Sequence, residues 1–291
     1  MWEDYEKVER FKNIENYVGE KNKYYSQYNQ DRNLENAIFK GYKKGVFVDV
    51  GAYDGVDINN TLYFETTNNW RGINIEPIEE VYKRLESNRK KSINIKTVIS
   101  DKEELIEFII LNNKFEMLSG IKKNYSDMQK MRVDIELQEE LKTTEELKNI
   151  EELKRIKLIK TERLETILDK YNILNINYLS IDVEGSELNV VKSINFEKVF
   201  IDVIGFENNR NIGNILKEIL KLDEYNIVSD IEIENLKLDE YNKEREIVNY
   251  LKKNGFVELE TNCQGWGDIF MINSKSEFLT DDVKKLIVHR F

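Results

Sequence analysis

A turn near residue 50 combines a glycine with two carboxylates, and this combination indicates what it could bind. The turn reads Asp49-Val50-Gly51-Ala52-Tyr53-Asp54-Gly55 and follows the apolar run 46–48. A strand that ends in a glycine turn lets backbone N–H groups approach a ligand closely. The dinucleotide motif Gly-x-Gly-x-x-Gly fails here because its later glycines are replaced by Tyr53 and Val56, and the sequence contains no Gly-Lys-Ser or Gly-Lys-Thr of a P-loop.

The charge of this turn favours a cationic ligand. Carboxylates would repel a pyrophosphate, whereas they attract an amino or sulfonium group. S-adenosylmethionine carries both of these groups, so Asp49 and Asp54 favour it over a dinucleotide. The alternative is an ordinary tight turn in which both aspartates are solvated.

An acidic residue also ends the next predicted strand. Glu76 comes 25 residues after Gly51 and precedes Pro77. In nucleoside-binding α/β folds, an acid at this place accepts hydrogen bonds from ribose hydroxyls. Ser100-Asp101 follows the third predicted strand, where an acidic side chain can meet the adenine amino group. Glu76 alone could be a helix N-terminal charge, but in this order the residues describe one nucleoside site.

A further acidic group ends a strand in the second half of the chain. Residues 182–187 read Asp182-Val183-Glu184-Gly185-Ser186-Glu187, and Glu207-Asn208-Asn209 ends the next predicted strand. Open α/β sheets bind ligands at the carboxyl ends of their strands. Helix capping explains Ser186 and Glu187 but not Asp182, so we interpret this group as part of a binding site.

The elements that must position these acids are those of a largely parallel sheet. Short β-branched runs alternate with amphipathic helical patterns, which is typical of βαβ units. A closing antiparallel pair is predicted at 255–259 and 268–272, on either side of a glycine-rich turn. The other predicted strands are 46–50, 72–76, 93–99, 105–111, 178–183 and 199–206.

The domain organisation predicted from this pattern is simple. Residues 1–44 are polar with interleaved aromatics and indicate an N-terminal helical extension packed on the core. Residues 45–291 then form one domain, because no repeat and no Pro/Ser-rich linker interrupts it. Two segments fall outside the alternation, at about 134–160 and 223–242, and are predicted to be helical insertions. In the first, Thr143 and Glu146 form a candidate capping box.

Composition excludes several classes of site. With 44 Lys and Arg against 55 Asp and Glu, the net charge of -11 disfavours binding to bare nucleic acid. The single cysteine, Cys263, excludes a disulfide framework, and the single histidine, His289, excludes a His-clustered metal site. Any general base is therefore expected to be a carboxylate.

The chain has no apolar run near the roughly 20 residues of a membrane span. It begins Met1-Trp2-Glu3-Asp4, which lacks the basic head and apolar middle of a signal peptide. We therefore expect a cytoplasmic protein with no membrane partner.

Together these motifs resemble the FkbM family of S-adenosylmethionine-dependent methyltransferases. The resemblance covers roughly 25–120 and 160–273, and the family usually has a shorter link between the two halves. It is carried by Ser26-Gln27-Tyr28-Asn29-Gln30-Asp31, residues 46–55, Asn60-Thr61, Trp70-Arg71-Gly72, Ile75-Glu76-Pro77, Leu118-Ser119-Gly120, residues 178–188, Glu207-Asn208-Asn209 and the closing pair.

The resemblance implies a Rossmann-like class I methyltransferase fold: a seven-stranded, mostly parallel sheet whose last strand is antiparallel. It also implies S-adenosyl-L-methionine as cofactor, with S-adenosylhomocysteine as product. The cofactor-binding residues it implies are Gln30, Asp31, Asp49, Gly51, Ala52, Tyr53, Asp54, Asn60, Thr61, Glu76, Pro77, Ser100, Asp101 and Asp182.

Methyl transfer to a hydroxyl requires an aligned acceptor and removal of its proton. Asp182 is the first candidate for the catalytic base, with Glu184 and Glu207 behind it. Macrocycle and catechol methyltransferases hold a divalent cation at equivalent strand ends, and Asp182, Glu207 and Asn208 could imitate that oxygen-ligand set. A metal-free mechanism is nevertheless favoured, so no metal ligand is predicted.

The function predicted is O-methylation of a sugar, a glycan or a related polyhydroxylated small molecule. One alternative is a nucleic-acid (cap) 2′-O-methyltransferase, which would use a local basic patch such as Lys83, Arg84 and residues 89–91. Another is a non-catalytic nucleoside-binding or assembly module. The acidic composition argues against the first, and the intact acids at every strand end argue against the second. The sequence predicts neither the acceptor nor the oligomeric state.

Overall fold

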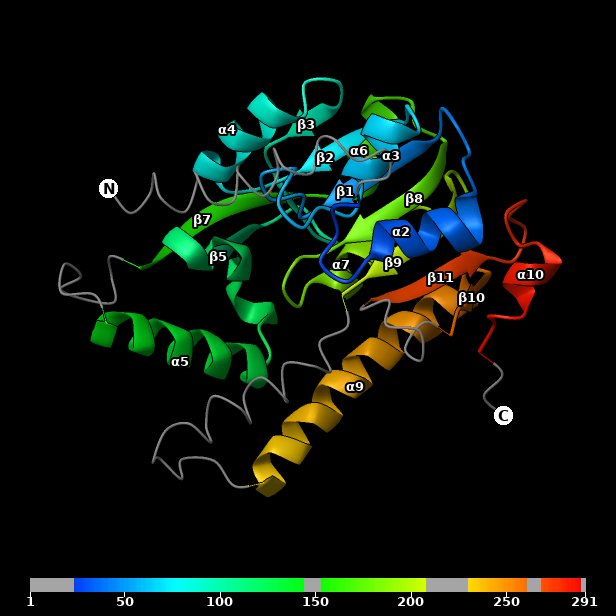
Figure 1. Cartoon of the computed structure of the whole chain (residues 1–291). Coiled ribbons are helices and arrows are strands. Elements are labelled where there is room, and N and C mark those ends of the chain that lie inside the picture. The colour runs from blue at the N-terminus through cyan, green and yellow to red at the C-terminus, as the bar shows by residue number, and fades with distance from the viewer. Residues whose placement is uncertain (1–23, 144–152, 208–229, 261–267, 289–291) are drawn as a thin grey trace.

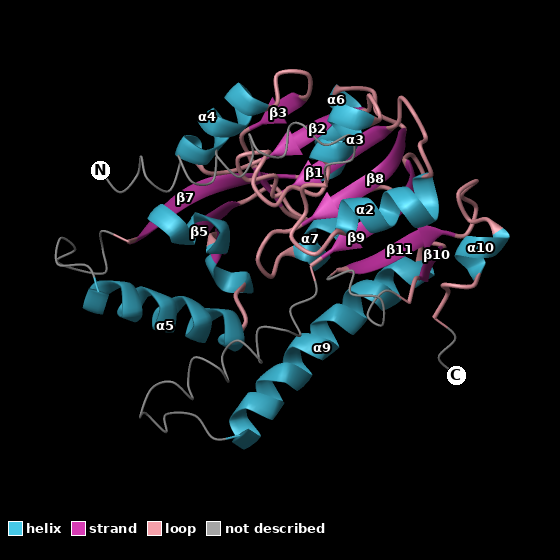
Figure 2. Ribbon diagram, in the orientation of Figure 1, coloured by secondary structure: helices cyan, strands magenta, loops and turns pink. Residues whose placement is uncertain are grey.

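The computed structural model describes residues 24–143, 153–207, 230–260 and 268–288, and a seven-stranded sheet runs through its centre (Figures 1 and 2). The strand order is β10-β11-β9-β8-β1-β2-β3. From β3 to β9 neighbouring strands are parallel, whereas β11 is antiparallel to both β9 and β10. The strands are β1 (Val46–Val50), β2 (Arg71–Ile75), β3 (Ile93–Ile95), β8 (Asn175–Ile181), β9 (Phe200–Phe206), β10 (Phe256–Glu258) and β11 (Ile269–Asn273).

The strands alternate between two cores because successive side chains point to opposite faces of a sheet. Phe47 packs with the aromatic cluster on one face, and Val48 and Val50 pack on the other. The aromatic face is covered by α2 (Gln30–Leu34), the π-helix η1 (Glu35–Phe39), α3 (Leu62–Thr67) and α10 (Asp281–Lys284). The opposite face is covered by α6 (Leu164–Lys170), α7 (Glu187–Lys192) and α9 (Asp230–Lys253). The protein therefore has a mixed α/β architecture with helices on both faces of the sheet.

A second, four-stranded sheet with the order β4-β7-β5-β6 lies beside the first. Its strands are β4 (Val98–Ile99), β5 (Leu105–Leu111), β6 (Gly120–Ile121) and β7 (Lys154–Glu162), with the 3-10 helices η2 (Asn113–Leu118) and η3 (Lys122–Asn124) next to β6. One face packs on α4 (Glu79–Asn88) through Ile78 and Val81. The other packs on α5 (Asp127–Thr143) through Val133 and Leu137.

The second sheet corrects two predictions. Residues 93–99 form no single strand: they divide into β3 in the large sheet and β4 in the small one, and the predicted strand at 105–111 pairs antiparallel with β7. The segment at 134–160, predicted as a helical insertion, contains the end of α5 and most of β7. Local pattern missed both because Val98 pairs with Thr161, far along the chain.

The remaining predicted segments lie partly in described residues. The predicted closing pair is present, since β10 and β11 are antiparallel. Within 24–44, α2 and η1 bury Leu34, Ile38 and Phe39 against the aromatic core, whereas 1–23 and Glu146 of the candidate capping box lie outside the described residues. Within 223–242, the described part opens α9, which continues to Lys253 and buries Ile247, Val248 and Leu251 in the main core.

No helix among the described residues has both the length and the apolar character that crossing a membrane requires.

The ends of the central strands meet at Gly51. Val50 lies beside Ile75 of β2 and beside Ile181 of β8, so the residues that follow these three strands are neighbours. Gly51 has φ of 90°, and a Cβ on it would lie 1.7 Å from the carbonyl oxygen of Asp182. Its N–H and that of Ala52 both donate to the carbonyl of Ile75 at 3.0 Å. Glycine is therefore required here for close backbone approach.

Substituting Gly51 tests this packing. We expect Gly51→Ala to lower the free energy of unfolding by about 1–2 kcal/mol for the left-handed backbone and by about 1–3 kcal/mol more for the clash. Gly255→Ala is a matched control, because Gly255 has φ of 89° but its Cβ would meet only Ser274 Oγ at 3.9 Å. Urea denaturation of both variants gives the comparison, and equal losses would contradict the close approach.

Candidate functional site

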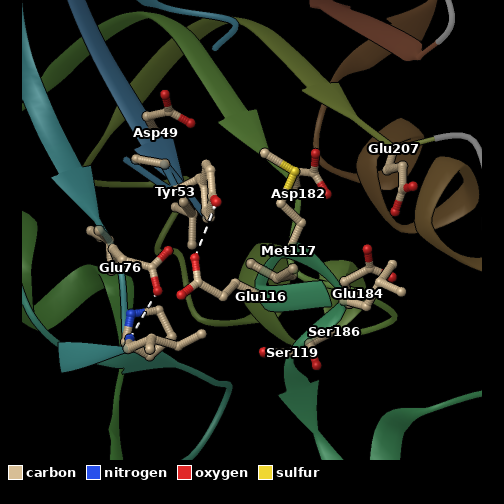
Figure 3. Close-up of a pocket in the computed structure, with 18 of the residues that line it drawn as sticks. Asp49, Tyr53, Glu76, Glu116, Met117, Ser119, Asp182, Glu184, Ser186 and Glu207 are labelled. Atoms are coloured by element: carbon tan, nitrogen blue, oxygen red, sulfur yellow. Dashed lines mark hydrogen bonds between the residues drawn. The ribbon is translucent and has the colours of Figure 1, made fainter. Parts of the chain in front are cut away.

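A cavity of about 240 Å³ opens at the carboxyl ends of β1, β2, β8 and β9. The small sheet forms one wall through Val98, Phe108 and Ile121. The helices α2, η2 and α5 also contribute to the lining, through Gln30, Met117 and Arg132 respectively. Figure 3 shows Asp49, Tyr53 and Glu76 on one side of this pocket, and Asp182, Glu184 and Glu207 on the other.

Most of the predicted site residues line this one cavity. They come from segments far apart in the sequence and meet only because their strands end at the same edge of the sheet. Those that line it are Gln30, Asp49, Gly51, Ala52, Tyr53, Asn60, Glu76, Pro77, Asp182, Glu184 and Glu207. Those that do not are Asp31, Asp54, Thr61, Ser100 and Asp101.

Three of the residues outside the lining shape the loops that form it. Asp31 is fully buried and accepts hydrogen bonds from the backbone N–H of Tyr25 at 2.6 Å and from Ser26 Oγ at 2.5 Å. Asp54 accepts from the N–H groups of residues 56 and 57, which tightens the glycine turn. Thr61 Oγ1 donates to Asp49 Oδ2 at 2.8 Å. These hydrogen bonds fix the conformation of the loops that form the cavity.

Ser100 and Asp101, predicted to lie beside the adenine, are not among the residues that line the cavity. Asp101 accepts a hydrogen bond from Asn189 Nδ2 of α7 at 2.7 Å, and Ser100 is fully buried. The chain leaves the large sheet after Ile95 to form β4, which carries both residues past the pocket. The cavity is instead lined in this region by Thr97, Val98 and Ile99.

A buried arginine holds the turn around Asp49. Arg89 Nε donates to Glu65 Oε2 at 3.1 Å, Nη1 to Asn59 Oδ1 at 3.0 Å and Nη2 to Thr61 Oγ1 at 3.2 Å. Asn59 and Thr61 in turn donate to Asp49 Oδ2, at 2.9 and 2.8 Å. Burial raises the pKa of Asp49, and the Arg89 charge with these two hydrogen bonds partly offsets the rise.

Glu76 lies at the end of β2 beside a cluster that includes Tyr53. Its Oε1 accepts a hydrogen bond from the N–H of Ile78 at 2.8 Å, and burial raises its pKa to about 8. Next to it, Tyr53 Oη donates to Glu116 Oε2 at 3.1 Å (Figure 3). Arg84 pairs with the same oxygen. Burial and the charge of Glu116 raise the pKa of Tyr53, so it remains a neutral hydrogen-bond donor.

Three carboxylates gather on the opposite side. One oxygen each of Asp182, Glu184 and Glu207 can be chosen so that all three lie within 4.8 Å of one another. Glu184 has φ of 51°, a left-handed conformation that costs energy in a residue with a side chain and is often found at functional sites. Gln129 Nε2 of α5 donates to Glu184 Oε2 at 3.2 Å.

Burial and mutual repulsion shift the titration of this carboxylate group. Asp182 is accessible from the pocket, while protein surrounds it on its other sides. This environment and the charge of Glu187 raise the pKa of Asp182, and burial with the charge of Asp182 raises that of Glu184. Asp268, which accepts from Gln30 Nε2 at 3.2 Å, has its pKa raised to about 8 by burial and by Asp182. Such shifts are typical of sites that handle protons.

Comparison with known protein families decides what this arrangement belongs to. Residues 49–257 match the model of the family described as Methyltransferase FkbM domain. The chain belongs to the FkbM methyltransferase family. Comparison with curated proteins finds none that matches the chain. The FkbM domain thus includes the glycine turn, Glu76 and the carboxylate group. It covers the small sheet and the large sheet except β11 and parts of β1 and β10.

Several residues that line the pocket were not predicted as site residues. They include Arg132, Glu116, Met117 and Asp268. Arg132 lies in α5, just before the predicted insertion at 134–160, and Asp268 was assigned to the closing pair but directly precedes β11. Met117 lies directly before Leu118-Ser119-Gly120, the one local signal that pointed to this stretch.

The carboxylate group of the FkbM domain also fits the ligand chemistry of a hard divalent cation. Asp182, Glu184 and Glu207 offer oxygen ligands, which Mg²⁺ and Ca²⁺ prefer. Asn208, named as a possible ligand from the sequence, lies outside the described residues. Arg132 already places a positive charge beside Glu184 and Glu207. The charge of Arg132 therefore offsets part of the negative charge of the carboxylates, which a metal ion would otherwise offset.

The raised pKa of Glu76 predicts a pH dependence of stability. Between its ordinary value of 4.5 and about 8, the folded protein holds a proton that the unfolded chain has lost. The contribution of Glu76 to stability therefore falls as the pH rises through this window, by up to about 1.4 kcal/mol per pH unit. We expect Glu76→Gln to make the free energy of unfolding fall less steeply with pH.

Urea titrations of the wild type and Glu76→Gln at several pH values between 5 and 8 measure this slope. Glu80→Gln, at an exposed position of α4, controls for the loss of a surface carboxylate. Identical slopes for the wild type and Glu76→Gln would contradict the assignment.

Proposed function

We propose that this FkbM methyltransferase uses S-adenosylmethionine to methylate a hydroxyl of a sugar, glycan or related polyhydroxylated small molecule. The observation that carries the proposal is the division of the pocket. Asp49 and Glu76 lie on one side, and Asp182, Glu184 and Glu207 lie on the other (Figure 3). One side suits a nucleoside with a cationic tail, and the other suits an acceptor that must lose a proton.

The strand order supports the finer assignment of the fold. From the central strand β1, the order continues through β2 to β3 at one edge of the sheet, and β8, β9, β11 and β10 lie on the other side of β1. The order of the strands along the chain therefore switches sides between β1 and β8. Open α/β folds bind their ligands at such a switch point. Together with the antiparallel β11, this arrangement supports a Rossmann-like class I methyltransferase.

The residues of the nucleoside side fit S-adenosylmethionine. When bound, this cofactor supplies a methyl group on a positively charged sulfur. Glu76 lies at the place where ribose hydroxyls are held in nucleoside-binding folds, and its carboxylate can accept their hydrogen bonds. Asp49 offers a buried negative charge that Arg89 holds in place through Asn59 and Thr61. Apolar Val98, Phe108 and Ile121 provide a surface for an adenine ring.

The acceptor side provides candidates for the proton transfer. Asp182 is the first choice for the base because it faces the pocket directly beyond Gly51, whose Cβ position the Asp182 carbonyl blocks. Glu184 and Glu207 lie within reach of the same proton. A raised pKa brings a carboxylate closer to the range in which it accepts a proton efficiently near neutral pH. Gln129 orients Glu184 through its hydrogen bond.

Cofactor binding is the first test of the proposal. We expect Asp49→Ala and Glu76→Ala each to weaken S-adenosylhomocysteine binding by about 10- to 100-fold at pH 9, above the pKa of about 8 of Glu76. Each variant removes hydrogen-bond acceptors that are worth about 1.5–3 kcal/mol when ionised. Isothermal titration calorimetry gives the affinities. Glu80→Ala is the matched control, because Glu80 is exposed and paired with Arg155 at 3.5 Å. Unchanged affinity in both pocket variants would refute the nucleoside assignment.

The chemical step is tested at Asp182. We expect Asp182→Asn to keep cofactor affinity within a few-fold and to lose about 10²- to 10⁴-fold in the rate of methyl transfer, the usual effect of removing a general base. Single-turnover transfer of a labelled methyl group measures the rate, with chelator and with Mg²⁺. Near wild-type transfer would move the role to Glu184 or Glu207. If chelator stopped the wild type and Mg²⁺ restored it, Asp182 would be a metal ligand instead.

A further inference from the structure

Tyr53, Arg84 and Glu116 form a polar cluster, the Glu116 cluster, on the nucleoside side of the pocket. We propose that this cluster links η2 to the glycine turn and to α4 across that side, and that the link retains the bound cofactor. Arg84 is then a positioning residue for cofactor binding. The proposal rests on the proposed function, because it concerns the nucleoside that Glu76 would hold.

Each member of the Glu116 cluster contacts the other two. Tyr53 Oη donates to Glu116 Oε2 at 3.1 Å, and Arg84 Nη2 forms an ion pair with the same oxygen. The guanidinium carbon of Arg84 also lies 5.5 Å from the centre of the Tyr53 ring, within the range of a cation–π contact. The three side chains therefore act as one unit.

The Glu116 cluster joins three elements that are far apart in the sequence. Tyr53 lies in the turn after β1, Arg84 lies in α4, and Glu116 lies in η2 between β5 and β6. Among the described residues, the side-chain hydrogen bonds that join η2 to this turn and to α4 all end on Glu116 Oε2. Loss of one partner would therefore weaken the link between two walls of the pocket.

The Glu116 cluster runs from the pocket wall to the protein surface. Tyr53 and Glu116 line the cavity, whereas Arg84 does not and has 35% of its side chain exposed. Figure 3 shows Tyr53 and Glu116 joined by their hydrogen bond, on the side of the pocket that carries Glu76. A nucleoside held at Glu76 would thus lie next to the cluster and could leave on this side only past it.

A second way in which these residues could act makes an opposite prediction. Burial raises the pKa of Glu76 to about 8, the charge of Glu116 raises it further, and the charge of Arg84 lowers it. If both residues acted only through the ionisation of Glu76, Arg84→Gln would weaken cofactor binding and Glu116→Gln would strengthen it. A link between two walls predicts weaker binding in both variants.

Dissociation of S-adenosylhomocysteine tests the link without knowledge of the acceptor. Surface plasmon resonance on the immobilised full chain measures the rate at pH 9, above the pKa of Glu76. We expect Tyr53→Phe, Arg84→Gln and Glu116→Gln each to raise the dissociation rate about ten-fold, the order of effect of losing one hydrogen bond to a charged group. Arg84→Lys keeps the charge and is expected to lose less than Arg84→Gln.

A double-mutant cycle shows whether Arg84 and Glu116 act as one unit. If they do, the double variant of Arg84→Gln and Glu116→Gln dissociates no more than about two-fold faster than either single variant. Effects that multiply to about a hundred-fold would show independent contacts and would overturn the proposal. Unchanged rates in the single variants, or changes in opposite directions, would also overturn it.

Lys83→Gln and Lys114→Gln are the matched controls. Each removes one ion pair from the same two helices, that of Lys83 with Glu79 at 3.3 Å in α4 and that of Lys114 in η2 with Glu140 at 2.5 Å. Neither lysine lines the cavity, so no change in the dissociation rate is expected. A rise in either control equal to that of Arg84→Gln would contradict a specific role of the Glu116 cluster.

A truncated ligand locates the effect and separates this proposal from the proposed function. 5′-Methylthioadenosine lacks the amino-acid part of the cofactor, and calorimetry is expected to give the same fold loss of affinity for it as for S-adenosylhomocysteine. A loss confined to S-adenosylhomocysteine would overturn the proposal. A wild type that binds neither ligand would refute the proposed function itself, whereas binding that no cluster variant changes would refute only the link.

Discussion

The buried guanidinium of Arg89 is the contact on which the nucleoside side of the pocket depends. It has no exposed surface, pairs with Glu65 of α3 at 3.1 Å and donates to the carbonyl of Gly55 at 3.0 Å. Through Asn59 and Thr61 it also determines how the Asp49 carboxylate is held. A buried charge is costly unless every partner is present, so one arginine at the end of α4 fixes the turn, the helix and the acid together.

The second sheet forms one wall of the pocket. β4, β5 and β6 place Val98, Phe108 and Ile121 along one wall, and α5 follows with Gln129 and Arg132. The first turns of α5, which precede the predicted insertion at 134–160, thus contribute two neighbours of the carboxylate group. The strand-end acids are thus held by the large sheet, while Gln129 and Arg132 beside them come from α5, which packs on the small sheet.

Strain and charge are concentrated at the same place. Tyr53, Ile58 and Glu184 all have positive φ and all line the cavity, although left-handed backbone is unfavourable for residues with side chains. Four carboxylates also share the acceptor side at the cost of mutual repulsion. The stable core around them, with Val48, Ile73 and Leu179 fully buried, holds both features in place. A site that stores strain and charge in this way is already organised before any ligand binds.

The sequence alone determined the strand-end acids of the large sheet. Asp49, Glu76, Asp182 and Glu207 each follow a short apolar run, and that local pattern is enough to predict that parallel strands bring them together. Only the tertiary structure decided that Asp101 turns away towards α7 and that Arg132 and Asp268 reach the pocket. The reason is the range of the interactions: a strand and its turn are encoded within a few neighbouring residues. The path of the chain after Ile95 depends on β4 pairing with β7, and that pairing joins Val98 to Thr161 across a long stretch of chain.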